Sequence, residues 1–125
     1  MWLFTRYGFF SIACAKQDEA SSVADPDQMM VRARQRRHLE NLKERFPELS
    51  TREIKEGIGT DYAYRLLVPK SVCATIAANL VQEQTWSNFK DEAARFLGHD
   101  CADYEDALHR VWRVMWELQN NEPAP

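Results

Sequence analysis

A β-hairpin pattern in residues 54–68 constrains the fold more than any other feature of the sequence. A short strand is predicted over residues 54–58, and the turn that follows contains Gly59, Thr60 and Asp61. In the second strand alternate positions carry the larger side chains Tyr62, Tyr64, Leu66 and Val68. Pro69 ends this strand, because proline has no backbone N–H for a sheet ladder. The chain is therefore expected to contain an antiparallel strand pair.

Strand and helix patterns before the hairpin extend this interpretation. Residues 2–15 are rich in aromatic and β-favouring side chains and predict a strand, in one or two pieces, with a bulge or close approach at Gly8. Of the two faces of this strand, the even-numbered one is the better candidate for packing into the core, and it carries Phe4, Gly8, Phe10, Ile12 and Cys14. Asp25-Pro26 resembles a helix start, and Pro47 would stop this helix after Phe46. One helix face would then bury Val31, Leu39, Leu42 and Phe46.

Three helices are predicted after the hairpin. The first runs from Ser71 to about residue 84, and a shorter one begins after Ser87 and is closed by Gly98. The last covers about residues 102–119, with a core stripe in steps of four and three formed by Tyr104, Leu108, Val111, Met115 and Leu118. This order predicts an α+β fold in which helices cover a small antiparallel sheet, a variant of the ferredoxin-like fold with extra C-terminal helices. We expect one domain over residues 1–119 and a flexible tail over 120–125.

Composition and charge narrow the class of protein. The 125 residues include 16 Lys and Arg against 19 Asp and Glu, so binding to an anionic partner would need a local basic patch. The cysteines Cys14, Cys73 and Cys101 are too few and too scattered for a disulfide framework. No segment has the roughly 20 apolar residues that a membrane span needs. We therefore expect a cytoplasmic protein with no membrane association and with reduced cysteines.

Several segments of the sequence resemble segments of a group of small bacterial proteins to which no function is assigned. They are WLFTRYGFFS, DPDQMMVRAR, TDYAYRLLVPK, NFKDEAAR and LHRVWRVM, and they span nearly the whole chain. The resemblance implies a stand-alone bacterial protein of this length. It implies no catalytic or binding residue.

Two groups of residues suggest binding to single-stranded nucleic acid. Residues 29–46 hold six basic residues against two acidic ones, and Arg34 and Arg37 lie off the expected apolar arc. Tyr7 and Phe9 lie on one strand face with Thr5 and Ser11, and Arg65, Glu53 and Lys55 would join that face if the hairpin belongs to the same sheet. The alternative interpretation is a solvated helix face and aromatic residues packed under a helix.

Residues 99–109 contain metal-ligating and nucleophilic side chains, but their spacing fits no known site. The group comprises His99, Cys101, Asp103 and His109, and helix capping and packing explain it more simply. Neither a phosphate-binding glycine loop nor a nucleophile elbow is present. We therefore expect no metal and no cofactor.

Trp112 and Trp116 lie one helical turn apart, beside His109 and next to the apolar stripe of the last helix. A helix this broadly apolar is either fully buried or presents its tryptophans to a partner. The leading hypothesis is a non-catalytic interaction module that self-associates, or binds another protein, through this helix. The second is a protein that binds single-stranded nucleic acid, and the third is a small enzyme of unknown class.

Overall fold

A computed structural model describes residues 1–18, 20–57 and 61–125, apart from the side chains of residues 99 and 100. The chain forms two compact units, Met1–Thr85 and Trp86–Pro125. The single domain over residues 1–119 and the flexible tail stay predictions.

The first unit contains a five-stranded sheet in the order β1-β2-β3-β5-β4, in which every neighbouring pair is antiparallel. The strands are β1 (Trp2–Thr5), β2 (Gly8–Lys16), β3 (Ala24–Ala33), β4 (Lys55–Glu56) and β5 (Tyr64–Pro69). β3 is the central strand, paired with β2 on one side and β5 on the other. The α+β class with an antiparallel sheet is confirmed, whereas its ferredoxin-like character stays a prediction.

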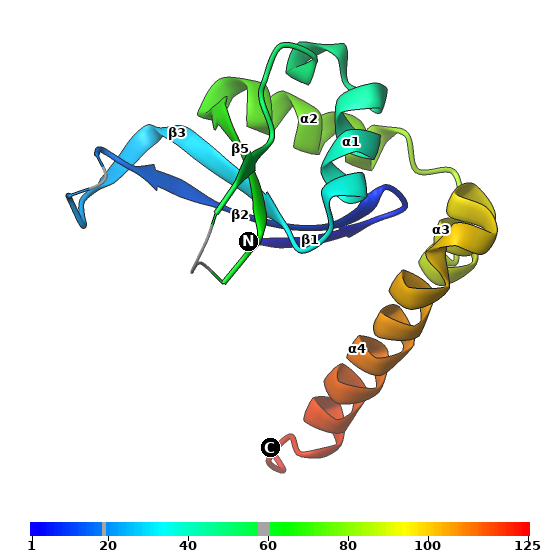
Figure 1. The fold of residues 1–125 in the computed structure, drawn as a ribbon. Helices are drawn as coiled ribbons and strands as arrows, with labels where there is room; N and C mark the ends of the chain where they lie inside the picture. The colour runs from blue at the N-terminus through cyan, green and yellow to red at the C-terminus, as the bar shows by residue number, and fades with distance from the viewer. Residues whose placement is uncertain (19, 58–60) are drawn as a thin grey trace. The chain divides into compact units, whose positions relative to one another are not determined.

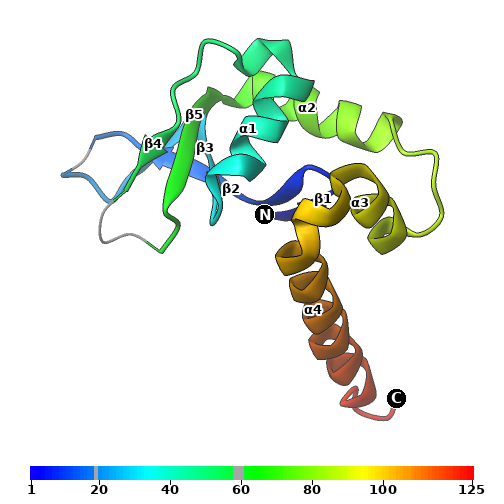
Figure 2. The same cartoon turned by 45° about the vertical axis from the view of Figure 1, so that its right-hand side comes forward.

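Two helices of the first unit, α1 (Arg36–Arg45) and α2 (Lys70–Gln82), lie on the same side of the sheet (Figures 1 and 2). A short 3₁₀ helix, Pro47–Leu49, follows α1, as expected where proline ends an α-helix. Apolar side chains from the sheet and both helices fill the space between these layers, including Phe10, Val31, Leu39, Leu42, Leu66, Val68 and Ile76. This burial supplies the main stabilising term of the unit.

The helix predicted from Asp25 to Phe46 is wrong over its first half. Residues 24–33 form β3, and only residues 36–45 are helical. The Asp25 carboxylate accepts the backbone N–H of Asp27 in a local turn, so it does not cap a helix. Pairing with strands on both sides stabilises β3 in a way that the local sequence does not encode.

The predicted strand over residues 2–15 is a hairpin of β1 and β2. Phe10 and Ile12 are buried on the helix-covered face, as predicted, but Phe4 lies on the opposite face with Phe9, its register partner. The chain reverses between Thr5 and Gly8, so the even-numbered side chains of β1 and of β2 point to different faces. The predicted hairpin of residues 54–68 is present as β4 and β5, and residues 58–60 of its turn lie outside the described residues.

Gly8 allows the β1–β2 turn to approach α1 closely. Its φ is +146°, and a Cβ there would lie 2.2 Å from Cγ of His38. His38 is buried, and its Nδ1 accepts the backbone N–H of Phe9 at 3.3 Å. The expected close approach at Gly8 is therefore confirmed, and it fixes the turn against the helix.

A polar network joins the same turn to the end of α2. The Tyr7 hydroxyl donates to Oε1 of Glu83 at 2.7 Å, and the guanidinium groups of Arg6 and Arg45 lie 3.5 and 3.0 Å from the Glu83 carboxylate. Tyr7 is buried, and desolvation followed by the Glu83 hydrogen bond raises the pKa of its hydroxyl. The network connects the β1–β2 turn with the C-terminal ends of both helices.

The second unit consists of α3 (Phe89–Leu97), a short 3₁₀ turn (Gly98–Cys101) and α4 (Ala102–Asn120), and α3 contacts α4. The N-cap of α3 is Asn88, whose side chain accepts the backbone N–H of Asp91. Gly98 ends α3 with a φ of +68°, as the sequence predicted. No helix in the described part of the chain is long and apolar enough to cross a membrane.

We predict that Gly8→Ala destabilises the first unit by about 3 kcal/mol, because the new Cβ overlaps the buried His38 ring and the residue keeps a positive φ. Urea unfolding followed by circular dichroism measures the loss. Gly98→Ala has the strained φ but open space around the Cβ, so it should cost less. Equal losses of unfolding free energy in Gly8→Ala and Gly98→Ala would contradict the predicted overlap between the new Cβ and His38.

We predict that the free energy of unfolding falls with pH above about pH 10 more steeply in the wild type than in Tyr7→Phe. The folded protein holds the Tyr7 proton more tightly than the unfolded chain, whose pKa is near the ordinary 10.0. The contribution of the protonated Tyr7 hydroxyl to the free energy of unfolding is therefore complete below pH 10. It is lost as the pH rises through the pKa of Tyr7 in the folded protein. Urea titrations at about pH 9 and about pH 11 test this; equal slopes would contradict it.

Candidate functional site

The face of the sheet opposite α1 and α2, here called the outer face, carries most of the chemistry in the first unit. One register row crosses all five strands on this face, because residues paired directly between antiparallel strands point to the same side. The row runs through Trp2, Ser11, Arg32, Arg65 and Lys55. It begins with an exposed indole on β1 and ends with three consecutive cations.

The three cations Arg32, Arg65 and Lys55, here called the cationic row, are adjacent like charges. In the part of the chain that the structure describes, none of the three forms an ion pair with an acidic side chain. Arg32 donates from Nη2 to the Ser11 hydroxyl at 2.8 Å. The Nε atoms of Arg32 and Arg65 are buried and have no hydrogen-bond acceptor among the described residues. Directly opposed like charges destabilise a sheet, so the row is an energetically unfavourable arrangement.

Three aromatic side chains, here called the aromatic group, lie on the outer face next to this row: Trp2, Phe4 and Phe9. Phe4 and Phe9 are stacked with ring centroids 4.6 Å apart, and Trp2 packs edge-on to Phe9 at 5.7 Å. Trp2 remains 66% exposed, although it is the largest side chain of the three. The group therefore offers an aromatic surface at the β1 edge of the sheet.

Tyr62 connects the aromatic group with the arginines. Its ring centroid lies 6.4 Å from that of Phe9, and the guanidinium carbons of Arg32 and Arg34 lie 4.8 and 4.3 Å from it. Arg34 also contacts the Asp61 carboxylate at 3.4 Å. Tyr62 is buried, so it holds the two guanidinium groups in place by cation–π contact.

The structure gathers some of the residues predicted to bind nucleic acid and separates others. Phe9 and Arg65 are on the outer face, and Arg34 follows the end of β3 beside them. Tyr7 is buried in the β1–β2 turn, and Arg37 belongs to α1, where its side chain donates to Gln35. The sequence interpretation missed Trp2, Phe4 and Arg32. Arg32 was missed because residues 25–33 were predicted to be helical and not a strand. Trp2 and Phe4 were missed because the chain reversal after Thr5 changes the face on which even-numbered residues of β1 lie.

A second candidate surface is the apolar face of α4. Tyr104 and Leu108 are buried, as predicted. The rest of the predicted core stripe is wrong, because Val111, Met115 and Leu118 are 36%, 57% and 63% exposed. Within the second unit, α3 and the short 3₁₀ turn do not cover these three side chains. The exposed apolar set of this helix comprises Val111, Trp112, Val114, Met115, Trp116 and Leu118.

The two tryptophans predicted to bind a partner are ordered against each other. The rings of Trp112 and Trp116 are stacked, with centroids 6.3 Å apart and planes inclined by 9°. The Lys90 ammonium lies 5.0 Å from the centroid of Trp112. Both indoles are half exposed, and His109 is also exposed on this helix.

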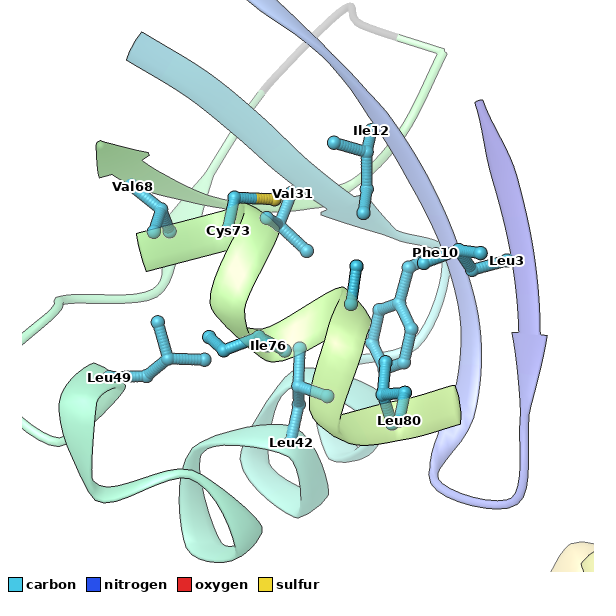
Figure 3. Close-up of a pocket in the computed structure, with 11 residues that line it drawn as sticks. Leu3, Phe10, Ile12, Val31, Leu42, Leu49, Val68, Cys73, Ile76 and Leu80 are labelled. Carbon is cyan, nitrogen blue, oxygen red and sulfur yellow. The ribbon is translucent and has the colours of Figure 1, made fainter. Parts of the chain in front are cut away.

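The interior of the first unit contains a small apolar cavity between the sheet and α1 and α2 (Figure 3). Its volume is about 10 Å³, which is room for about one water molecule. All of the side chains that line it are apolar, among them Phe10, Ile12, Leu42 and Ile76. A cavity of this size and lining is a packing defect of the core and does not suit a substrate.

The residues considered for metal binding do not assemble into a site within the described residues. No group of three or more His, Cys, Asp or Glu side chains there has the geometry to hold a metal ion. Cys101 is buried, and Asp103 accepts the backbone N–H of Tyr104 at 2.7 Å, whereas the His99 side chain lies outside the described residues. Within the described residues, none of Cys14, Cys73 and Cys101 forms a disulfide bond.

We predict that Arg65→Gln raises the free energy of unfolding by about 0.5 kcal/mol, because it removes the central charge of the cationic row. Arg65→Lys keeps that charge and should not raise the free energy of unfolding. Urea titration at low ionic strength measures both variants, and high salt should reduce the difference between them. A destabilised Arg65→Gln variant would contradict this description of the row.

Comparisons with known proteins assign no role to either surface. No family model, no curated protein and no solved structure matches the chain. The resemblance of the sequence segments to small bacterial proteins therefore stays an interpretation.

Proposed function

We propose that the protein is a non-catalytic interaction module that self-associates through α4. The observation that supports this proposal is the exposed apolar face of α4 with its stacked Trp112–Trp116 pair. At 100° per residue, the six exposed apolar side chains span an arc of roughly 200° between Val114 and Trp116. An apolar arc this wide is typical of a helix that contacts a partner.

The size of the face favours a protein partner over solvent. Two half-exposed indoles and four aliphatic side chains together expose apolar area on the order of several hundred Å². Monomeric proteins rarely leave a continuous patch of this size in water. Tryptophan is also the residue most enriched in the centres of interfaces.

The spacing of the face favours a second copy of the chain as that partner. The exposed residues Val111, Met115 and Leu118 follow one another in steps of four and three, the spacing with which two helices pack along a shared seam. No charged side chain interrupts the seam between these positions, while Arg110, Arg113 and Glu117 lie on the other side of the helix. A two-fold axis would bury each apolar face against its own copy.

We predict that the wild type is a dimer and that Trp116→Glu weakens the association at least about 30-fold, the equivalent of a hot-spot loss of about 2 kcal/mol. The substitution places a charge within the apolar arc, at its Trp116 end, on a residue that is 50% exposed, so the fold should persist. Light scattering from about 1 to about 100 μM measures the mass of each variant, with circular dichroism as the folding control.

Arg113→Gln is the matched control, because it changes the charge by the same amount on the polar side of the same helix. It should remain as dimeric as the wild type. If Trp116→Glu fails to fold, Leu118→Lys, at a more exposed position, takes its place. A wild type that is monomeric at the highest concentration, or a control that dissociates equally, overturns the proposal.

A further inference from the structure

We propose that the outer face of the sheet binds single-stranded nucleic acid, with phosphates on the cationic row and unpaired bases on the aromatic group. This site lies on the first unit and uses none of the residues of the α4 face. It also differs from the site expected from sequence, because neither Tyr7 nor α1 takes part in it.

The arrangement of charge calls for a ligand with repeated negative charges. Neighbouring strands are about 4.8 Å apart, so Arg32, Arg65 and Lys55 form a line of cations across β3, β5 and β4. An anion bound along this line would relieve their mutual repulsion. A polyanion would do so at all three positions and would release the counterions that it carries.

Hydrogen bonding points to phosphate as the anion. The guanidinium groups of Arg32 and Arg65 form no ion pair with a carboxylate of the described residues. A guanidinium group donates in a planar fork, and phosphate oxygens match this fork. The contacts of Arg32 with Ser11 and Tyr62 already hold its side chain in place, which lowers the entropy lost on binding.

The aromatic group distinguishes an unpaired strand from other phosphate compounds. Trp2 occupies the same register row as the arginines, on the far side of Ser11, and is 66% exposed. Base faces are accessible to such a side chain only when the bases are not stacked in a duplex. The five strands span roughly 19 Å across four inter-strand spacings, enough for a short run of nucleotides.

The charge of the whole chain limits the strength of this binding. The net charge is −3, so attraction is confined to the outer face and falls steeply as salt is added. Three phosphate contacts predict a slope of about −2 in a plot of log affinity against log salt for a single strand.

Fluorescence anisotropy of a labelled 20-nucleotide oligouridine at about 50 mM salt tests the proposal. The wild type should bind this probe and should bind a duplex RNA of the same length at least about tenfold more weakly. Arg65→Gln should lower affinity at least about fivefold and reduce the salt slope by about 0.7. Trp2→Ala should lower affinity at least about fivefold without changing the slope, because it removes stacking and no charge.

Arg113→Gln is again the matched control and should bind as the wild type does, since it removes one positive charge from the second unit. Circular dichroism verifies the fold of each variant. If Arg65→Gln does not fold, Lys55→Gln carries the charge test, because Lys55 is exposed on the edge strand.

Three results would overturn the proposal: no binding of the single strand at low salt, an equal loss in Arg113→Gln, or equal affinity for single strand and duplex. Competition by inorganic polyphosphate at the same phosphate concentration as effectively as by the oligonucleotide would also overturn it, by showing an anion site without base stacking.

Discussion

The pairing of β3 on both of its edges is the interaction on which the rest of the first unit depends. β3 joins the β1–β2 hairpin to the β4–β5 hairpin, and without it the sheet would divide into two separate strand pairs. Isolated hairpins are marginally stable in water, whereas a sheet of several strands with one apolar face can support a core. Val31 and Ala33 lie on that face and are almost fully buried, and Val31 pairs with Ile12 on one side and Leu66 on the other.

The same strand determines the chemistry of the outer face. Because side chains alternate along a strand, burial of Val31 and Ala33 directs Arg32 to the opposite side. The register with β5 then sets Arg32 beside Arg65, and the register of β4 adds Lys55. A shift of one residue in either pairing would separate these charges and bury arginine in the core. The cationic row is therefore a direct consequence of the strand register that the core requires.

The two candidate surfaces differ in how they are formed. The apolar face of α4 arises from one helix, and its residues are all close in sequence. The outer face combines side chains from β1, β2, β3, β4 and β5, which span more than fifty residues of sequence. Self-association through α4 would bring two outer faces into one particle. Two linked sites on one nucleic-acid strand would bind more tightly than either site alone.

Local patterns in the sequence were sufficient for much of the fold. The β4–β5 pair, the three helices after it and the stop at Pro47 were predicted correctly, because alternation, helical periodicity, proline and glycine act over a few residues. Trp112 and Trp116 were also singled out, since two tryptophans one turn apart on a predicted helix are visible without any structure.

Only the tertiary structure decided the conformation of residues 24–33, the faces of Trp2 and Phe4, and the exposure of Val111, Met115 and Leu118. Each depends on a partner that is distant in sequence, or on the lack of one. Residues 24–33 have apolar positions compatible with a helix, and hydrogen bonds to β2 and β5 select the strand. The periodicity of α4 determined that it has an apolar face, but periodicity does not determine whether the rest of the second unit supplies enough surface to cover it.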